Sequence, residues 1–194
     1  MNKIILASNS KVRKKSLNEN GIECKVFPSN VDEELAKEGL LKENSSPEMI
    51  SKNLAELKAN KISLKFNNEI VLGADSVIDI NRELVSKPKN REEALIILKK
   101  LNGKTHYLIS SVCISKNGSM IWNYTDKAAL TMKDMTDQQL KEYLLKIKDE
   151  ALYAYNVYQI EGEGRSLFLK IEGNEDTIMG LPVKKIKDYL RNFK

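Results

Sequence analysis

Hydroxyl side chains stand between a short apolar run and a basic cluster in the stretch KIILASNSKVRKKSL, at positions 3–17. A strand that turns into a helix here leaves backbone N–H groups at the helix start, where the helix dipole favours anions. Ser8 and Ser10 add hydroxyl donors, and Arg13 can reach back with a bidentate fork. The stretch predicts a phosphate-binding turn, although taken alone an ordinary capped helix with a solvated basic face is the commoner explanation. It lacks the glycines of a Walker A loop.

A carboxylate stands in the middle of the clearest strand of the chain, EIVLGADSVIDI at positions 69–80. The period of two places Gly73, Asp75 and Val77 on one face. A buried carboxylate is costly unless it binds a metal, a cation or a hydrogen-bond donor, and Gly73 leaves room for a ligand beside it. We therefore expect Asp75 to be functional rather than merely hydrogen-bonded to a neighbouring turn.

Three further segments carry charged side chains that could serve the same site. The acidic residues 32–34, which include Glu33, could hold Mg²⁺ together with substrate phosphates, although solvated acidic loops are common. Lys58 lies at the edge of the apolar face of a predicted helix and could extend toward a site, but the spacing alone favours a surface lysine. Lys87 follows a strand and precedes a proline turn, where loops often carry function.

A glycine turn occurs late in the chain, in YQIEGEGRSLF at positions 158–168. The glycines there, which flank Glu161 and Glu163, allow the backbone to approach a ligand closely, and Arg165 adds a cation. The alternative is a β-turn that only connects two elements.

Strands and helices alternate along most of the chain, which indicates an α/β or mixed α+β fold. Candidate N-caps precede four helices, a fifth helix opens at Pro182, and Lys116-Asn117-Gly118 predicts a hairpin between two long strands. The acidic segment 30–39, NVDEELAKEG, shows no element of its own. Strands are expected at 3–7, 24–27, 69–80, 105–115, 120–132 and 164–173, and helices after Ser8 or Ser10, Ser46, Asn90, Thr136 and from Pro182.

The composition is that of a globular protein rather than a disordered one. The chain has 194 residues, 41% apolar and 30% charged with a net charge of +5, so we expect one domain over residues 1–194, or one domain elaborated into two lobes. Basic and acidic residues are interleaved and aromatics make up only 6%, so no nucleic-acid partner is expected. Cys24 and Cys113 lack metal or disulfide spacing and are expected to be buried thiols. The absence of a signal-peptide pattern and of a long apolar stretch predicts a cytoplasmic protein without a membrane segment.

The order of the short motifs along the chain resembles that of the Maf family of nucleoside triphosphate pyrophosphatases. The segments are LASNSKVR, VDEE, LAELKA, GADSVI, SKPKN, IEGEG and GLP, and they extend from Leu6 to Pro182. The resemblance implies cleavage of a triphosphate, including modified or non-standard nucleotides, to the monophosphate and pyrophosphate, with Mg²⁺ or another divalent cation such as Mn²⁺. It also implies a long, bent mixed sheet flanked by helices, as in the ITPase-like fold, with a cleft between two lobes, and a homodimer in many members.

The same resemblance implies roles for individual residues. Asp75 is the implied proton acceptor, and Glu33 and Asp75 the implied metal ligands. The other implied members of the site are catalytic Lys58 and Lys87 and substrate-binding Ser8, Ser10, Arg13 and Glu161. In that family Lys11 and Val12 are usually proline and arginine, and a glutamine is common at the position of Glu161. Glutamate there resembles the branch that acts on 7-methylguanosine triphosphate, and glutamine the branch that acts on thymidine and uridine triphosphates; a third reading is that Glu161 contacts metal.

Two other classes of function stay open at this level. The loss of the usual arginine leaves room for a regulator of cell division and septum formation whose cleft has weak or no activity. The many lysines leave room for a nucleic-acid-binding module, which salt-dependent retention on single strands would reveal.

Overall fold

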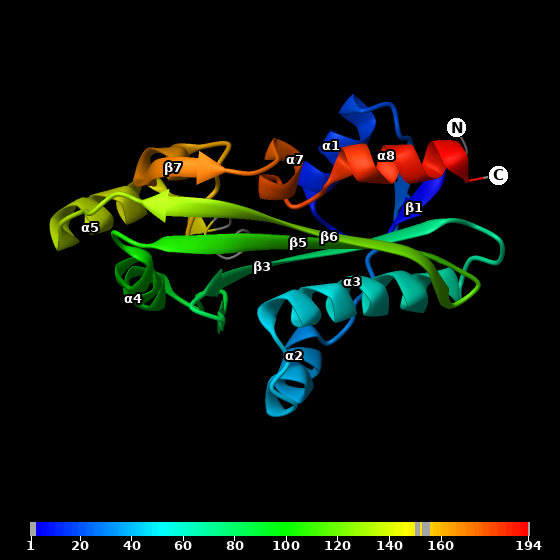
Figure 1. Ribbon diagram of the computed structural model, residues 1–194, viewed down its shortest axis with the longest axis horizontal. Coiled ribbons are helices and arrows are strands. Elements are labelled where there is room, and N and C mark those ends of the chain that lie inside the picture. The colour runs from blue at the N-terminus through cyan, green and yellow to red at the C-terminus, as the bar shows by residue number, and fades with distance from the viewer. Residues whose placement is uncertain (1–2, 150–151, 153–155, 194) are drawn as a thin grey trace.

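The computed structural model describes residues 3–149, 152 and 156–193. Within them, seven strands form one mixed sheet (Figure 1): β1 (Ile4–Leu6), β2 (Cys24–Val26), β3 (Val71–Ile80), β4 (Glu83–Val85), β5 (Thr105–Lys116), β6 (Ser119–Met132) and β7 (Phe168–Glu172). The helices are α1 (Lys11–Glu19), α2 (Glu33–Lys42), α3 (Pro47–Ser63), α4 (Arg91–Leu101), α5 (Asp137–Lys146), the 3₁₀ helix η1 (Glu163–Leu167), α7 (Glu175–Ile178) and α8 (Val183–Asn192). The expected mixed sheet flanked by helices is confirmed.

One edge of strand β3 is only partly paired with other strands. Its order is β2-β1-β3-β5-β6-β7; β1 runs parallel to β2 and β3, and the remaining pairs are antiparallel. Strand β1 pairs with β3 only as far as Leu72, and β4 pairs with the same edge from Ile78 onward. Among the described residues, positions 73–77 of β3 therefore have no strand beside them on that edge, and Asp75 lies in the gap.

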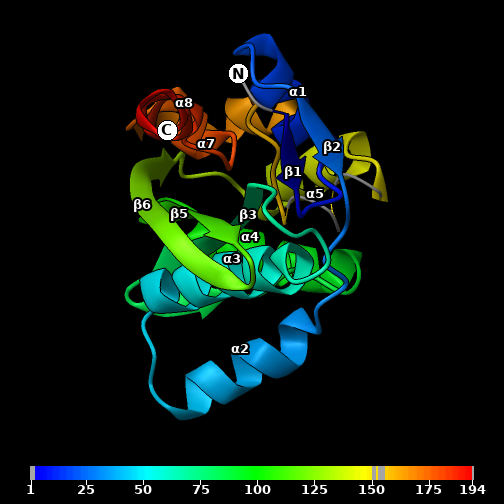
Figure 2. The ribbon, with the colours of Figure 1, turned by 90° about the vertical axis from the view of Figure 1, so that its right-hand side faces the viewer.

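Helices cover both faces of the sheet, and the buried side chains form two main clusters. Helix α3 lies along one face, whereas α1, α7 and α8 lie on the other (Figures 1 and 2). One cluster joins β1, α1, α8 and the start of β3. The other joins the end of β3 to β4, α4, α5 and β7. The open edge of β3 lies between the two clusters, which correspond to the two expected lobes.

Local sequence signals account for most of the helix starts and for the hairpin. At each predicted N-cap the side chain accepts a hydrogen bond from the backbone N–H three residues on, at Ser10, Ser46, Asn90 and Thr136. Thr136 and Gln139 complete a capping box, which pairs two otherwise unsatisfied donors. Asn117 and Gly118 both have positive φ, 51° and 83°, as a two-residue turn between twisted strands requires.

Three expectations differ from the structure. The acidic segment 30–39 contains most of helix α2, because Asp32 caps the helix by accepting from the N–H of Leu35. The strand expected over 164–173 begins only at Phe168, because the preceding residues form η1. Cys113 is buried as expected, whereas Cys24 is only half-buried because β2 is the edge strand. No helix in the described part of the chain is long and apolar enough to cross a membrane.

Candidate active site

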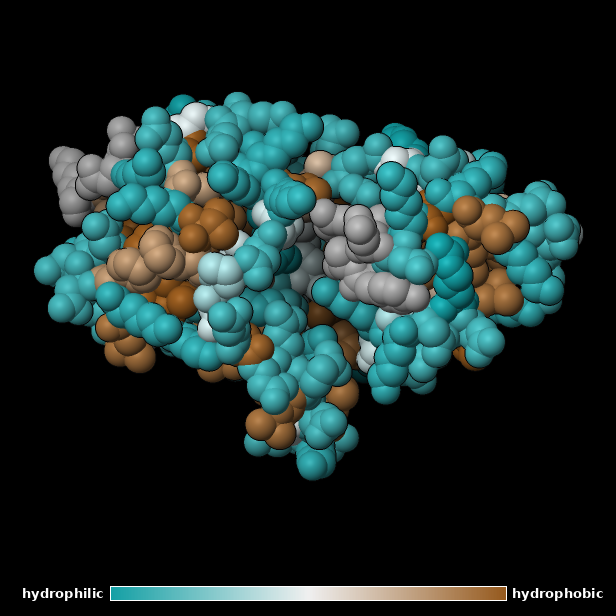
Figure 3. Space-filling view, turned by 180° about the vertical axis from the view of Figure 1, so that it is seen from behind, coloured by the Kyte–Doolittle hydropathy of each residue, from teal (hydrophilic) through white to brown (hydrophobic). Residues whose placement is uncertain are grey.

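A cleft of about 860 Å³ opens where the edge of β3 is unpaired. Its walls come from the turn after β1, the start of α2, the segment 84–87, the segment 156–161 and the turn 178–180. Seen from behind, the surface is mostly hydrophilic and is hollowed near its centre, above the projecting α2 (Figure 3). The volume is within the range of small-molecule sites.

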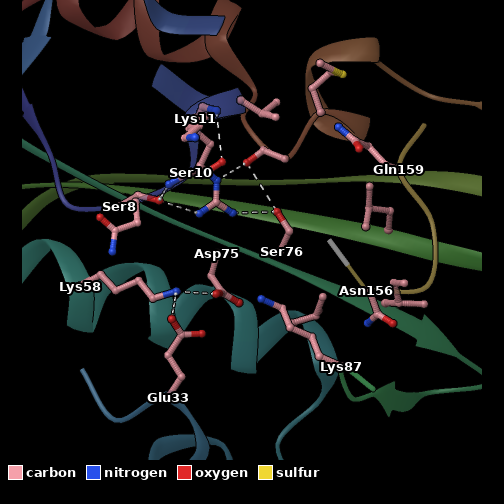
Figure 4. Close-up of a pocket in the computed structure, with 18 of the residues that line it drawn as sticks. Ser8, Ser10, Lys11, Glu33, Lys58, Asp75, Ser76, Lys87, Asn156 and Gln159 are labelled. Atoms are coloured by element: carbon pink, nitrogen blue, oxygen red, sulfur yellow. Dashed lines mark hydrogen bonds and ion pairs between the residues drawn. The ribbon is translucent and has the colours of Figure 1, made fainter. Parts of the chain in front are cut away.

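A lysine lies between two carboxylates on one side of this cleft (Figure 4). The Nζ atom of Lys58 is 2.7 Å from Oδ1 of Asp75 and 2.9 Å from Oε1 of Glu33. Lys58 and Asp75 are only 6% and 5% exposed, so the surface position that spacing favoured for Lys58 is wrong. The expectation that Asp75 has a partner is confirmed, and the partner is the Lys58 ammonium.

The two carboxylates have the oxygen chemistry that a divalent cation requires. The second oxygen of Asp75, Oδ2, is buried without a hydrogen-bond partner in the described part of the chain. No group of three or more His, Cys, Asp or Glu side chains there could hold a metal ion alone. Mg²⁺ is commonly bound by one or two carboxylates together with substrate phosphates, so Glu33 and Asp75 fit a cation that arrives with its substrate.

The charges in the cleft shift the ionisation of Glu33 and Lys87. Burial raises the pKa of the Glu33 carboxyl, but Lys58, by its charge and hydrogen bond, and then Lys87 and Lys37 outweigh burial, so the net pKa is lowered. Desolvation lowers the pKa of Lys87, and the charges of Glu33 and Asp75 oppose it only in part. Lys87 is exposed in surface area, yet the cleft walls reduce the hydration of its ammonium.

The lowered pKa of Glu33 predicts a pH-dependent contribution to stability. A carboxyl with a depressed pKa in the folded state stabilises the fold above its ordinary value, here 4.5, and loses that contribution as the pH falls through the lower, folded value. We expect the difference in unfolding free energy between the wild type and Glu33→Gln to be constant near neutral pH and to shrink below pH 4.5. Urea unfolding at several pH values measures this difference.

Glu34→Gln is the matched control for that experiment. It removes the same charge from the next residue of α2, where the carboxylate bonds Lys37 instead of Lys58. A difference for Glu33→Gln that stays the same from neutral pH to pH 3 would contradict the prediction.

The turn after β1 is organised by its own side chains. The hydroxyl of Ser8 accepts from the backbone N–H of Ser10 at 3.2 Å, and the hydroxyl of Ser10 accepts from the N–H of Arg13 at 3.3 Å. Ser10 rather than Ser8 is therefore the N-cap of α1. The Arg13 guanidinium reaches the cleft as expected, but it donates to four protein acceptors, the carbonyls of Gly180 and Ala74 and the hydroxyls of Ser8 and Ser76.

The part of the cleft across from Ser8, called the far half below, combines apolar lining residues with a few polar groups. Leu84, Leu108, Tyr158, Ile160 and Ile178 form its walls. The polar groups are those of Asn156, Gln159 and Glu161. Asn156 and Gln159 lie across the cleft from Ser8 (Figure 4). Glu161 thus lines the same cleft as Asp75, and the structure brings all the expected site residues to it.

Sequence reasoning missed Lys37, Ser76 and Asn156 as lining residues. Lys37 lies one helical turn after Glu33, and its side chain is only 14% exposed. The spacing of four residues would have placed both on one face, but only once α2 had been recognised from its cap at Asp32. Ser76 and Asn156 carried no signal of their own.

Comparisons with known proteins find relatives that match nearly the whole chain. A family model described as Maf-like protein matches residues 3–193. A nucleoside triphosphate pyrophosphatase of Pelagibacter ubique is 72% identical over 191 residues, which cover 98% of both chains. A 7-methyl-GTP pyrophosphatase of Rhizobium etli is 33% identical over 191 residues, 98% of this chain and 96% of its own. A HAM1 protein from Coxiella burnetii superposes over the full length of both chains with a TM-score of 0.58 and 13% identity, which shows the shared fold.

Proposed function

This chain belongs to the Maf family, and on that premise we propose that it hydrolyses nucleoside triphosphates to nucleoside monophosphates and pyrophosphate. The observation that carries the proposal is the buried cluster of Glu33, Lys58 and Asp75 at the open edge of β3. Within the described residues the second oxygen of Asp75 has no hydrogen-bond partner, and its place beside a turn suited to phosphate fits metal-assisted hydrolysis of an acid anhydride.

The phosphates would lie between the turn after β1 and Lys87. The N–H groups at the start of α1 and the hydroxyl of Ser8 are donors suited to phosphate oxygens. The ammonium of Lys87 would neutralise charge that builds on the departing pyrophosphate, as in other phosphoryl transfers. Mg²⁺, or Mn²⁺ in its place, would be held by Glu33 and Asp75 and would supply Lewis-acid stabilisation of the phosphate charge.

Asp75 would act on the attacking water. As the water oxygen bonds to the α-phosphorus and the bond to the bridging oxygen breaks, the carboxylate of Asp75 takes up the proton. Lys58 fixes the carboxylates of Asp75 and Glu33 through one oxygen of each, so both keep a defined orientation. Catalysis would then come mainly from positioning and electrostatics.

Pyrophosphate release from a panel of triphosphates tests the activity and the base preference together. With Mg²⁺, we expect turnover of one or two among the common triphosphates, dTTP, UTP, CTP and 7-methyl-GTP. If Glu161 selects guanine, 7-methyl-GTP is the preferred member, because a carboxylate accepts hydrogen bonds from guanine N–H groups. If the folded protein releases no pyrophosphate from any of these triphosphates, with Mg²⁺ or with Mn²⁺, the proposal is contradicted and the division-regulator alternative is favoured.

Glu161→Gln is the informative variant for that preference. The amide keeps the shape of the side chain but adds a donor for a pyrimidine carbonyl. We expect kcat/KM for 7-methyl-GTP to fall about tenfold relative to UTP, the size of one lost charged hydrogen bond. An unchanged ratio would assign the base preference to other residues of the far half, such as Gln159.

The working form of the enzyme is a further part of the proposal. We place it in the cytoplasm, where nucleoside triphosphates are available, and as a homodimer. Large apolar side chains at Leu35, Leu41, Met49 and Leu57 are exposed on the side of α2 and α3, which supports association of two copies. Sedimentation velocity measures the mass in solution, and a monomer at micromolar concentration would contradict the dimer.

A further inference from the structure

Arg13 is bound from several directions by acceptors of the protein itself. Its Nε donates to the Gly180 carbonyl at 3.1 Å, its Nη1 to the Ala74 carbonyl at 2.8 Å and to the Ser8 hydroxyl at 3.4 Å, and its Nη2 to the Ser76 hydroxyl at 3.2 Å. A guanidinium has five N–H donors, so at least four of them are used within the protein. The acceptors belong to the turn after β1, the open edge of β3 and the turn before α8.

The Ser76 hydroxyl is itself held from within the sheet. The hydroxyls of Ser76 and Ser110 are 2.9 Å apart, and Ser110 donates to the Thr177 carbonyl at 2.8 Å. A hydroxyl has one hydrogen to donate, so Ser110 must accept from Ser76, which leaves Ser76 to accept from Arg13. The Ser76 hydroxyl also lies 3.5 Å from the Gly180 carbonyl, and its shorter distance to Ser110 favours donation to Ser110.

Ser110 lies outside the cleft, although it belongs to this chain of hydrogen bonds. Ser110 is fully buried on β5, where it is the residue directly opposite Ser76 of β3. It is not among the residues that line the cleft. Gly180 closes the arrangement: its φ is +78°, and a Cβ atom there would lie 3.1 Å from the Ser76 hydroxyl. A side chain at this position would strain the backbone and displace the Ser76 hydroxyl, so glycine favours the close approach of the turn before α8 to Ser76 and Arg13.

We propose that Arg13 acts as a clamp that positions the phosphate-binding turn against β3, and that Ser110 is a positioning residue that sets this clamp through Ser76. The guanidinium then orders Ser8 and the start of α1 and does not bind the phosphates through a bidentate fork of its own. The inference rests on the proposed function, because the turn that the clamp orders is the one proposed to hold the substrate phosphates.

Ser110→Ala tests the clamp, and Ser115→Ala is its matched control. Ser115 is also fully buried on β5, but its hydroxyl donates to the side chain of Asn60 on α3 at 2.6 Å and is not one of the Arg13 acceptors. For Ser110→Ala we expect KM for the preferred triphosphate, and the Kd for inorganic tripolyphosphate by calorimetry, to rise about tenfold with kcat within about twofold. Ser115→Ala should change neither, and Ser110→Thr, which keeps the hydroxyl, should restore KM.

The outcomes separate this inference from the proposed function. Equal KM and Kd values in folded Ser110→Ala and Ser115→Ala overturn the clamp and leave the hydrolase activity standing. If the wild type hydrolyses no triphosphate, the proposed function fails, and the clamp is then judged by the binding of tripolyphosphate alone. Weaker binding by Ser110→Ala than by Ser115→Ala supports the clamp. Equal binding by the two variants, or no binding by either, overturns it. If Ser110→Ala does not fold, Ser110→Cys is judged by the same criteria.

Discussion

Replacing Asp75 by asparagine is expected to reduce turnover by about a thousandfold or more, because the change removes both a proton acceptor and a metal ligand. The amide preserves the shape of the side chain, and its oxygen can still accept a hydrogen bond from Lys58. Glu33 remains 2.9 Å from the Lys58 ammonium, so the buried lysine keeps a charged partner. We therefore expect Asp75→Asn to fold, which circular dichroism and thermal unfolding would verify.

Asp79→Asn is the matched control for this result. Asp79 lies on β3 four residues after Asp75, on the same face of the strand, but it does not line the cleft. Its Oδ1 atom is buried and has no hydrogen-bond partner among the described residues, so the same substitution tests the loss of a strand carboxylate without touching Lys58. Near-normal turnover in folded Asp75→Asn, or an equal loss in both variants, would contradict the role assigned to Asp75.

The parts of the fold that the sequence predicts are those that depend on neighbouring residues. The caps at Ser46, Asn90 and Thr136 and the Asn117-Gly118 turn are decided within three or four positions, so the pattern contains the whole cause. The sequence did not predict the helix that begins after Asp32, for a related reason. Helix α2 has no buried side chain and stands apart below α3 (Figure 2), so it shows little of the apolar periodicity by which helices are recognised.

The site depends on contacts between distant segments, which no local pattern contains. The cleft exists because β1 stops pairing at Leu72 and β4 begins at Ile78, which is a matter of strand register. Three of the four acceptors of the Arg13 guanidinium lie 61, 63 and 167 positions away along the chain. The sequence predicted that Asp75 needs a partner because burial of a carboxylate has a cost at any position, but it could not identify Lys58 as that partner.

The sequence favoured a surface position for Lys58 because the burial of this residue depends on a single close approach between α3 and β3. A Cβ atom at Gly73 would lie 2.2 Å from the Ala55 carbonyl oxygen and 2.7 Å from the Ala59 backbone nitrogen. The helix backbone therefore rests directly on the strand, and Lys58, between those two alanines, is brought to Asp75. If side chains separated the backbone of α3 from β3, the same lysine would lie at the surface, as its spacing suggests.

This close approach predicts that Gly73→Ala is among the most damaging single-methyl additions in the chain. Neither partner can yield cheaply, since both are backbone atoms of a helix, so α3 must move away from β3. Overpacking of this kind costs about 3 kcal/mol, and the movement would also lengthen the ion pair between Lys58 and Asp75. We expect a loss of unfolding free energy of that size in urea, together with reduced turnover under conditions where the variant is still folded.

Gly39→Ala in α2 provides the comparison that separates space from helix propensity. A Cβ atom at Gly39 would meet nothing within 4 Å, so alanine there should stabilise the protein by up to about 1 kcal/mol through its better helix propensity. If Gly73→Ala costs less than about 0.5 kcal/mol, the helix can move off the strand freely. The position of Lys58 would then be set by its two carboxylates and not by the packing of α3. If instead Gly73→Ala loses both stability and turnover while Gly39→Ala loses neither, the glycine before Asp75 is the residue that builds the site from the fold.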